Sequence, residues 1–239
     1  MVNTGVVSAA ADKRSRDQDR RRPGWPEAGA AVLAAAVLYT VGAVAVLRLP
    51  PGCPISPGQA NFLVSGLAPL GAFALAALIR FRDVRPFGVR RTDAGWLFVA
   101  PGIGLACFVL SWPVSALFDP LFPGSESVQQ GYRDAASAGL SSLVVTVALG
   151  GLLTPLGEEA LFRGVLAQFL LRWGTWIGLV VSAAIFALAH GINAVMPLAF
   201  VIGLSTGLLL QLSGSIWPGV LVHAVYNSLG IFYHAAAGG

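Results

Sequence analysis

The sequence predicts an all-α fold, a polytopic helical membrane bundle of about seven to eight transmembrane helices. Of its 239 residues, 56% are hydrophobic and only 11% are charged, whereas a soluble domain carries roughly 25% charged residues. The hydrophobic residues also occur in long blocks rather than in the alternation of a half-buried strand. Lipid is therefore expected to surround most of the chain.

The N-terminal residues 1–27 are polar and contain six of the 15 Lys and Arg residues, followed by Pro23 and Pro26. Such a composition is typical of a disordered tail, which we place in the cytoplasm. Residues 28–239 are expected to form a single membrane-embedded helical domain. Its first hydrophobic run, Ala28–Leu47, is long enough for a full span and too long for the hydrophobic region of a cleaved signal peptide.

Loops that are rich in proline or charge separate the later hydrophobic runs. The loops at 48–61 and 119–139 each contain one Lys or Arg, but five arginines follow the second run. The positive-inside rule therefore places the N-terminus in the cytoplasm. The remaining predicted spans are Phe62–Ile79, Trp96–Phe118, Leu140–Leu156 with an apolar extension to Leu171, Trp176–His190, Met196–Leu212 and Ile216–Phe232.

The net charge of +4 reflects membrane topology, because 11 of the 15 basic residues lie in the two short stretches that are expected on the cytoplasmic side. No nucleic-acid partner is expected. The expected location is the cell membrane, with lipid and a membrane-associated peptide or protein as partners. The bias toward Ala, Gly and Arg indicates a bacterial source.

Three charged residues lie inside an apolar segment, where each charge costs roughly 2.5 to 3.5 kcal/mol. Glu159 and Arg163 are four residues apart, so they can pair on one helical face. Glu158 points to a different face, where an apolar cavity suits a general acid or base. A structural Glu–Arg clamp between helices is the alternative explanation.

All three histidines lie in the last fifty residues. His190 ends one apolar segment, whereas His223 and Asn227 share a face of another. A single histidine in a helix is more often a packing residue than a catalyst. Two of them near an intramembrane carboxylate pair favour a site instead, and His234 is assigned no role.

Spacing predicts that Glu158 and His190 meet. The segment 172–175 resembles a turn, with Gly174 ending one helix and Thr175 as the N-cap of the next. Glu158 lies 14 residues before Arg172 and His190 lies 15 after Thr175, so both arms rise by roughly 21 to 22 Å. His223 follows Trp217 by only six residues, or roughly 9 Å, and is expected nearer the cytoplasm than Glu158.

These residues resemble the motifs of a known family of intramembrane proteases, the type II CAAX prenyl endopeptidase-like proteins, also called the CPBP or Abi family. The similar region is a protease-like core at about 140–232. Three stretches carry the resemblance, in the same order: Glu158-Glu159-x-x-x-Arg163, Phe186-x-x-x-His190 and His223-x-x-x-Asn227.

The resemblance implies an intramembrane endopeptidase in which Glu158 and His190 activate a water. It further implies that His223 and Asn227 stabilise the oxyanion, while Glu159 with Arg163 holds the helices. Whether a metal takes part is open: Glu158, His190 and His223 could ligate zinc, but the HExxH motif is absent. We favour activation of water without a metal.

Two alternatives remain open. Ser205 lies in a GxSxG sequence and, with His223, could form a rhomboid-like serine protease, although Gly203 and Gly207 also form a GxxxG packing motif and no strand precedes the serine. A non-catalytic membrane immunity protein or a transporter could instead use the buried charges as a network. Transporters commonly show repeated halves, and the two halves of this sequence do not match.

Overall fold

The computed structural model describes residues 22–81, 83–123 and 126–237, so residues 1–21 of the predicted tail lie outside the described range. Within that range the chain forms helices and no strand, which confirms the all-α prediction. The principal helices are α2 (Trp25–Leu47), α3 (Pro57–Ile79), α4 (Ala94–Phe118), α5 (Glu126–Ser137), α9 (Thr175–Ala189), α10 (Val195–Ser213) and α11 (Trp217–Ala237), with one continuous helix between α5 and α9.

The continuous helix runs over Leu140–Trp173 and has 34 residues. Two π-helical segments interrupt its α-helical geometry, each a place where the backbone completes a wider turn. Its segments are α6 (Leu140–Thr146), η3 (Val147–Leu153), α7 (Thr154–Glu159), η4 (Ala160–Ala167), α8 (Gln168–Leu170) and the short 3-10 turn η5 (Leu171–Trp173).

Five helices of the described chain are long and apolar enough to cross a membrane, namely α2, α3, α4 extended to Leu121, the continuous helix Leu140–Trp173, and α10. The shorter α9 and the more polar α11 complete the same bundle. A polytopic helical membrane protein is therefore confirmed, with a helix at the place of each of the seven predicted spans.

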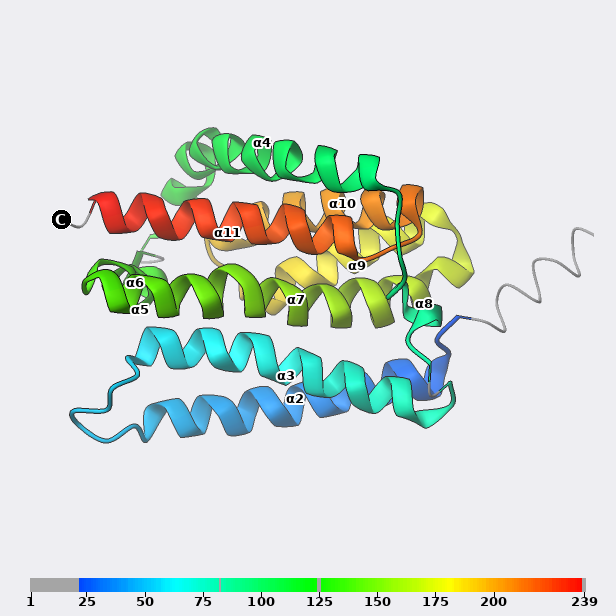
Figure 1. Ribbon diagram of the computed structural model, residues 1–239, viewed down its shortest axis with the longest axis horizontal. Coiled ribbons are helices and arrows are strands. Elements are labelled where there is room, and N and C mark those ends of the chain that lie inside the picture. Colours follow the sequence, from blue (N-terminus) through cyan, green and yellow to red (C-terminus); the bar gives the residue numbers. More distant parts are fainter. Residues whose placement is uncertain (1–21, 82, 124–125, 238–239) are drawn as a thin grey trace, which may run out of the picture.

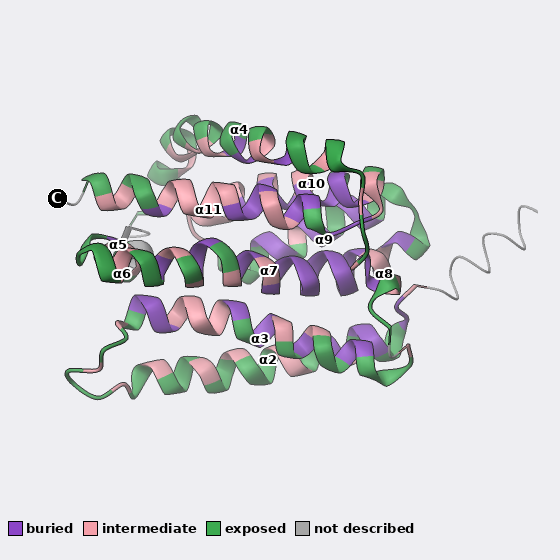
Figure 2. Ribbon diagram, in the orientation of Figure 1, coloured by how far each residue is buried: buried purple, intermediate pink, exposed green. Residues whose placement is uncertain are grey.

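The continuous helix lies at the centre of the bundle (Figure 1). The hairpin of α2 and α3 packs along one side of it, and α11 packs along another and also contacts α4. Helices α9 and α10 form a second hairpin, whose α10 contacts α11. Buried residues are concentrated on the central helix around α7, whereas α2 and α4 are largely exposed (Figure 2), as expected for helices that face lipid.

Helix α2 begins at Trp25, three residues before the predicted start of the span. The reason is Glu27, which is fully buried. Its carboxylate accepts a hydrogen bond from the Gly24 backbone N–H at 2.6 Å and pairs with Arg80 at 3.1 Å. The start of α2 is thereby fixed to the end of α3.

The predicted loop at 119–139 contains the helix α5, which lies at one end of the bundle (Figure 1). Helix α5 approaches α3 so closely that a Cβ atom on Gly58 would collide with the carbonyl oxygen of Gly131. The rings of Phe62 and Tyr132 lie 4.3 Å apart beside this contact. These contacts seat α5 on α3.

The turn between the continuous helix and α9 is where it was predicted. Gly174 adopts a φ of 119°, in the region that favours glycine, and ends the helix. Thr175 is the first residue of α9 rather than its N-cap, because Gly174 occupies the cap position. That detail of the prediction is wrong, but the hairpin itself is confirmed.

Candidate active site

The two adjacent glutamates lie on α7, which is the short α-helical stretch between the two π-helical segments. Glu158 and Glu159 are both buried, as is Arg163 one turn later, with exposed fractions of 6%, 0% and 1%. Helix α7 itself is fixed by Gly157, where a Cβ atom would collide with the Gly66 carbonyl oxygen of α3. The backbone that carries both carboxylates is therefore held against α3.

Glu159 forms the predicted pair with Arg163, four residues further along the helix. Glu159 Oε2 lies 3.2 Å from Arg163 Nε. Its other oxygen, Oε1, lies 3.2 Å from Nδ1 of His223 on α11. Glu159 therefore joins a buried cation to a histidine, a contact that spacing along the sequence does not predict.

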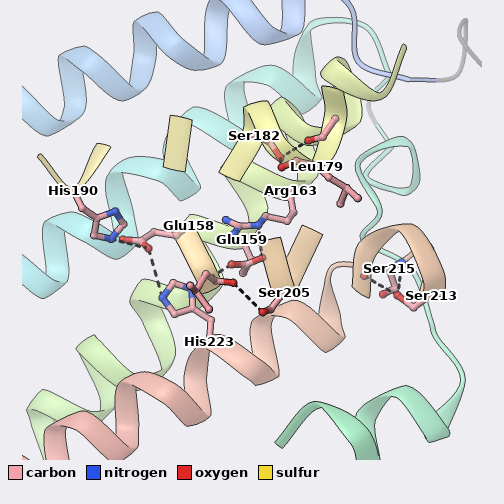
Figure 3. A network of polar contacts seen from close by, with 12 residues as sticks. Glu158, Glu159, Arg163, Leu179, Ser182, His190, Ser205, Ser213, Ser215 and His223 are labelled. Atoms are coloured by element: carbon pink, nitrogen blue, oxygen red, sulfur yellow. Dashed lines mark hydrogen bonds and ion pairs between the residues drawn. The ribbon is translucent and has the colours of Figure 1, made fainter. Parts of the chain in front are cut away.

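Glu158 lies between the two histidine rings (Figure 3). Its Oε2 atom is 4.0 Å from Nε2 of His190 and 3.8 Å from Nε2 of His223. Both separations exceed a direct hydrogen bond, and contacts of this length are often bridged by a water. The structure thus brings together one carboxylate and two imidazole rings, each of which can donate or accept a proton.

The backbone and Glu159 orient the two imidazole rings. His190 follows the last residue of α9, and its Nδ1 lies 2.8 Å from the carbonyl oxygen of Phe186, so Nδ1 carries the proton. His223 turns its Nδ1 toward the carboxylate of Glu159. In each ring the remaining nitrogen, Nε2, faces Glu158.

His223 lies at the depth of the two glutamates, so its predicted position nearer the cytoplasm is wrong. The turn before α11 is held inside the bundle, because the Ile216 N–H donates to Gly88 O at 3.0 Å and Ser215 Oγ donates to Arg90 O at 2.8 Å. The start of α11 is set back from the turn between α8 and α9 (Figure 1). Six residues of α11 are then enough to reach Glu158.

Asn227 follows His223 by one turn, but its amide makes a different contact. Its Nδ2 donates a hydrogen bond of 2.9 Å to the carbonyl oxygen of Gly150 in the π-helical segment η3. Pro155 has no N–H, so it cannot donate to that carbonyl as the fifth residue of a π-helical turn would. Asn227 fills this vacant position and fixes α11 to the central helix.

A cavity of about 790 Å³ opens beside these residues. Glu158, His190, His223 and Asn227 line it, whereas Glu159 and Arg163 do not. The first four therefore face the space that a substrate would occupy. Glu159 and Arg163 lie behind them.

Several lining residues come from helices to which the sequence assigned no role. Tyr39 of α2, Tyr132 of α5 and Tyr226 of α11 line the cavity, and burial raises the pKa of the Tyr132 phenol. Phe186 packs its ring against both histidines and lies under the Arg163 guanidinium, 4.3 Å from the ring centre. Phe186 could have been predicted as a site residue from its spacing of four from His190. No pattern in the sequence marks the three tyrosines as lining residues.

The separations between the donor atoms of the site differ from those between the ligands of a zinc ion. Ligand atoms held tetrahedrally at about 2.0–2.1 Å from zinc lie about 3.3 Å from one another, which is shorter than both separations from Glu158 to the histidines. Among the described residues, no group of three or more His, Cys, Asp or Glu side chains is arranged to hold a metal ion. In this arrangement Glu158 and the two histidines therefore lie further apart than the ligands of a zinc ion.

Ser205, the nucleophile of the alternative serine mechanism, donates its hydroxyl to the Val201 carbonyl at 2.9 Å. Its other neighbour is the Sγ atom of Cys107 at 3.8 Å. A Cβ atom on the flanking Gly203 would lie 3.0 Å from Ala183, and one on Gly207 would lie 3.2 Å from Leu179, both across the α9–α10 hairpin. The GxSxG stretch therefore serves close helix packing, and the serine alternative is not favoured.

Fold and site together define a polytopic helical membrane protein with a buried carboxylate–histidine site. Residues 140–229 match the family model of the type II CAAX prenyl endopeptidase, Rce1-like. This part of the chain is therefore similar to that family, and the match confirms the resemblance inferred from the three motifs. All six predicted site residues lie inside the matched range.

One curated relative is an uncharacterized 24.3 kDa protein of Escherichia coli, which is 31% identical over 104 residues. The similar stretch covers 41% of this chain and 48% of the relative, so the match spans about half the length of that protein. No solved structure matches the chain.

Proposed function

We propose that the protein is an intramembrane endopeptidase that hydrolyses a peptide bond of a membrane-associated peptide or protein. The observation that carries the proposal is the position of Glu158 Oε2, 4.0 Å from His190 Nε2 and 3.8 Å from His223 Nε2, on the wall of a cavity of about 790 Å³. The family match over residues 140–229 supports a protease.

Glu158 and His190 activate the water in this proposal. Glu158 removes one proton from the water, while Nε2 of His190 accepts a hydrogen bond from it and orients it. The water oxygen forms a bond to the carbonyl carbon of the substrate, and the carbonyl oxygen becomes an oxyanion. When the C–N bond breaks, Glu158 returns the proton to the leaving amine, so the products are a carboxylic acid and an amine.

His223 and Asn227 stabilise the oxyanion. Nδ1 of His223 faces the Glu159 carboxylate, so Nε2 is the nitrogen that faces the cavity, and when it carries a proton it donates to the oxyanion. Asn227 uses one amide hydrogen for the Gly150 carbonyl and has a second hydrogen for the substrate. Donors that are already oriented before the reaction stabilise developing charge most effectively.

The test is proteolysis by the purified protein, with products identified by mass spectrometry from membranes of cells with and without the protein. Glu158→Ala and His190→Ala are expected to abolish the product, whereas Ser205→Ala is expected to retain it. Loss of activity in Ser205→Ala would contradict the assignment. A cellular phenotype that depends on Glu158, without any product from the wild type, would instead favour the transporter or immunity alternative.

A further inference from the structure

The end of the cavity away from Glu158 carries a partly buried cation, Arg133 of α5, which forms no ion pair within the described part of the chain. The Nε atom of Arg133 is buried and has no hydrogen-bond partner among the residues that the structure describes. Its acidic neighbour Asp134 does not pair with it, because Asp134 accepts a hydrogen bond from Gln130 at 2.7 Å on the exposed face of α5. Arg133 itself lines the cavity.

A buried guanidinium donor without an acceptor is unfavourable by the cost of its lost hydration. Carboxylates are scarce on the protein side, because Glu158 is the only acidic residue among the described residues that line the cavity. An acceptor that enters the cavity with a ligand would satisfy the guanidinium. The planar fork of an arginine matches a carboxylate with two parallel hydrogen bonds.

The surroundings of Arg133 suit the end of a peptide chain. Ser115 of α4 and His234 of α11 line the same cavity and offer further polar groups. Burial and the nearby Arg133 charge both lower the pKa of His234. Trp112 and Tyr233 form an aromatic wall there, with ring centres 6.3 Å apart. This end therefore combines one cation with polar and aromatic side chains.

Helix α11 runs along the cavity from one end to the other, so positions on it give the distance between the two ends. His223 lies at the catalytic end and His234 at the Arg133 end, eleven residues later, which is about 16 Å along a helix. An extended peptide rises roughly 3.3 Å per residue, so about five residues cover this distance.

We propose that Arg133 is a specificity-determining residue that binds a carboxylate of the substrate about five residues from the scissile bond. This inference rests on the proposed endopeptidase function. The carboxylate belongs either to the C-terminus of the substrate or to an acidic side chain. Arg133 lies outside the segment that matches the family model, so this preference is a property of the N-terminal part of this chain.

Three pools of N-dansylated apolar decapeptides test the proposal in detergent micelles. The first pool ends in a free carboxylate, the second in an amide, and the third in an amide with a glutamate as its last residue. The wild type is expected to cleave one or both carboxylate pools at least about tenfold more efficiently than the neutral amide pool, mainly through KM. The pool that is preferred identifies the source of the carboxylate.

Arg133→Ala and Arg133→Gln are expected to reduce this ratio from about ten to about one. The matched control is Arg48→Ala, which removes an exposed arginine at the same end of the bundle and is expected to keep the ratio. Equal efficiency on all three pools in the wild type, or a ratio that survives loss of Arg133, would overturn the proposal.

Binding of the same pools to the Glu158→Gln protein, followed by dansyl fluorescence, separates this inference from the proposed function. A tenfold tighter binding of a carboxylate pool that is lost on Arg133→Gln supports the role of Arg133 even if the wild type cleaves none of them. Cleavage of all pools without any binding preference would overturn the role of Arg133 and leave the endopeptidase intact.

Discussion

Glu159 and His223 lie 64 positions apart in the sequence, yet Oε1 of the glutamate is 3.2 Å from Nδ1 of the histidine. The second oxygen of the same carboxylate binds Arg163. A single buried glutamate therefore fixes both a cation on its own helix and a histidine on α11. This links the Glu159–Arg163 pair to His223, to which the proposed mechanism assigns the oxyanion, because movement of Glu159 would also move His223.

Replacing Glu159 with alanine is expected to destabilise the protein by about 3–5 kcal/mol, because it leaves the buried Arg163 charge without its partner. Unfolding in detergent, followed by circular dichroism, measures the change. Adding Arg163→Met to Glu159→Ala should recover part of the loss. Losses that simply add would show that the two side chains do not interact in the folded protein.

Asn227→Leu is expected to lower kcat by about 10²–10³, because one oxyanion donor is removed. The lost hydrogen bond to Gly150 should also reduce stability by about 1 kcal/mol. Kinetics on a cleaved peptide and unfolding of the same preparation measure the two effects. A loss of stability alone, with kcat nearly unchanged, would restrict Asn227 to fixing α11 against η3.

Gly157→Ala is expected to destabilise the protein by about 1–3 kcal/mol and to lower activity, because the new Cβ collides with the Gly66 carbonyl and must displace α7. Gly102→Ala in α4 is the matched control, since a Cβ there meets nothing within 4 Å. Thermal unfolding and cleavage rates of both variants compare the two sites. Equal behaviour of the two would show that the close contact of α3 with α7 does not position Glu158.

Chelation with 1,10-phenanthroline is expected to leave the cleavage rate unchanged, because the separations from Glu158 to the two histidines exceed those of zinc ligands. The assay is run on purified protein after dialysis against the chelator, with its non-chelating 1,7-isomer as control. An activity that disappears on chelation and returns with added zinc would make the protein a metalloprotease.

The loop that follows α2 is expected on the outer side of the membrane, because the positive-inside rule places the N-terminus in the cytoplasm. Cys53 lies in this loop and is partly exposed, whereas Cys107 is buried. A membrane-impermeant maleimide should therefore label intact cells at Cys53, and Cys53→Ser should remove the label. Labelling only after the cells are broken would reverse the topology.

Helical periodicity and the lengths of the helical segments were sufficient to predict part of the site. The pair of Glu159 with Arg163 follows from a spacing of four residues, which is local geometry. The meeting of Glu158 with His190 follows from two arms of equal length on either side of one turn at Gly174. Both relationships depend only on the rise of a helix and on the position of a helix stop.

The sequence by itself therefore determined the membrane bundle, the order of its spans and the candidate residues Glu158, Glu159, Arg163, His190, His223 and Asn227. Tertiary structure alone decided how deep His223 lies, because the turn before α11 is held inside the bundle by hydrogen bonds to Gly88 and Arg90. It also decided that Arg133 reaches the cavity, because a close glycine contact seats α5 on α3. Contacts between segments far apart in sequence leave no periodic signal, and only packing in three dimensions sets them.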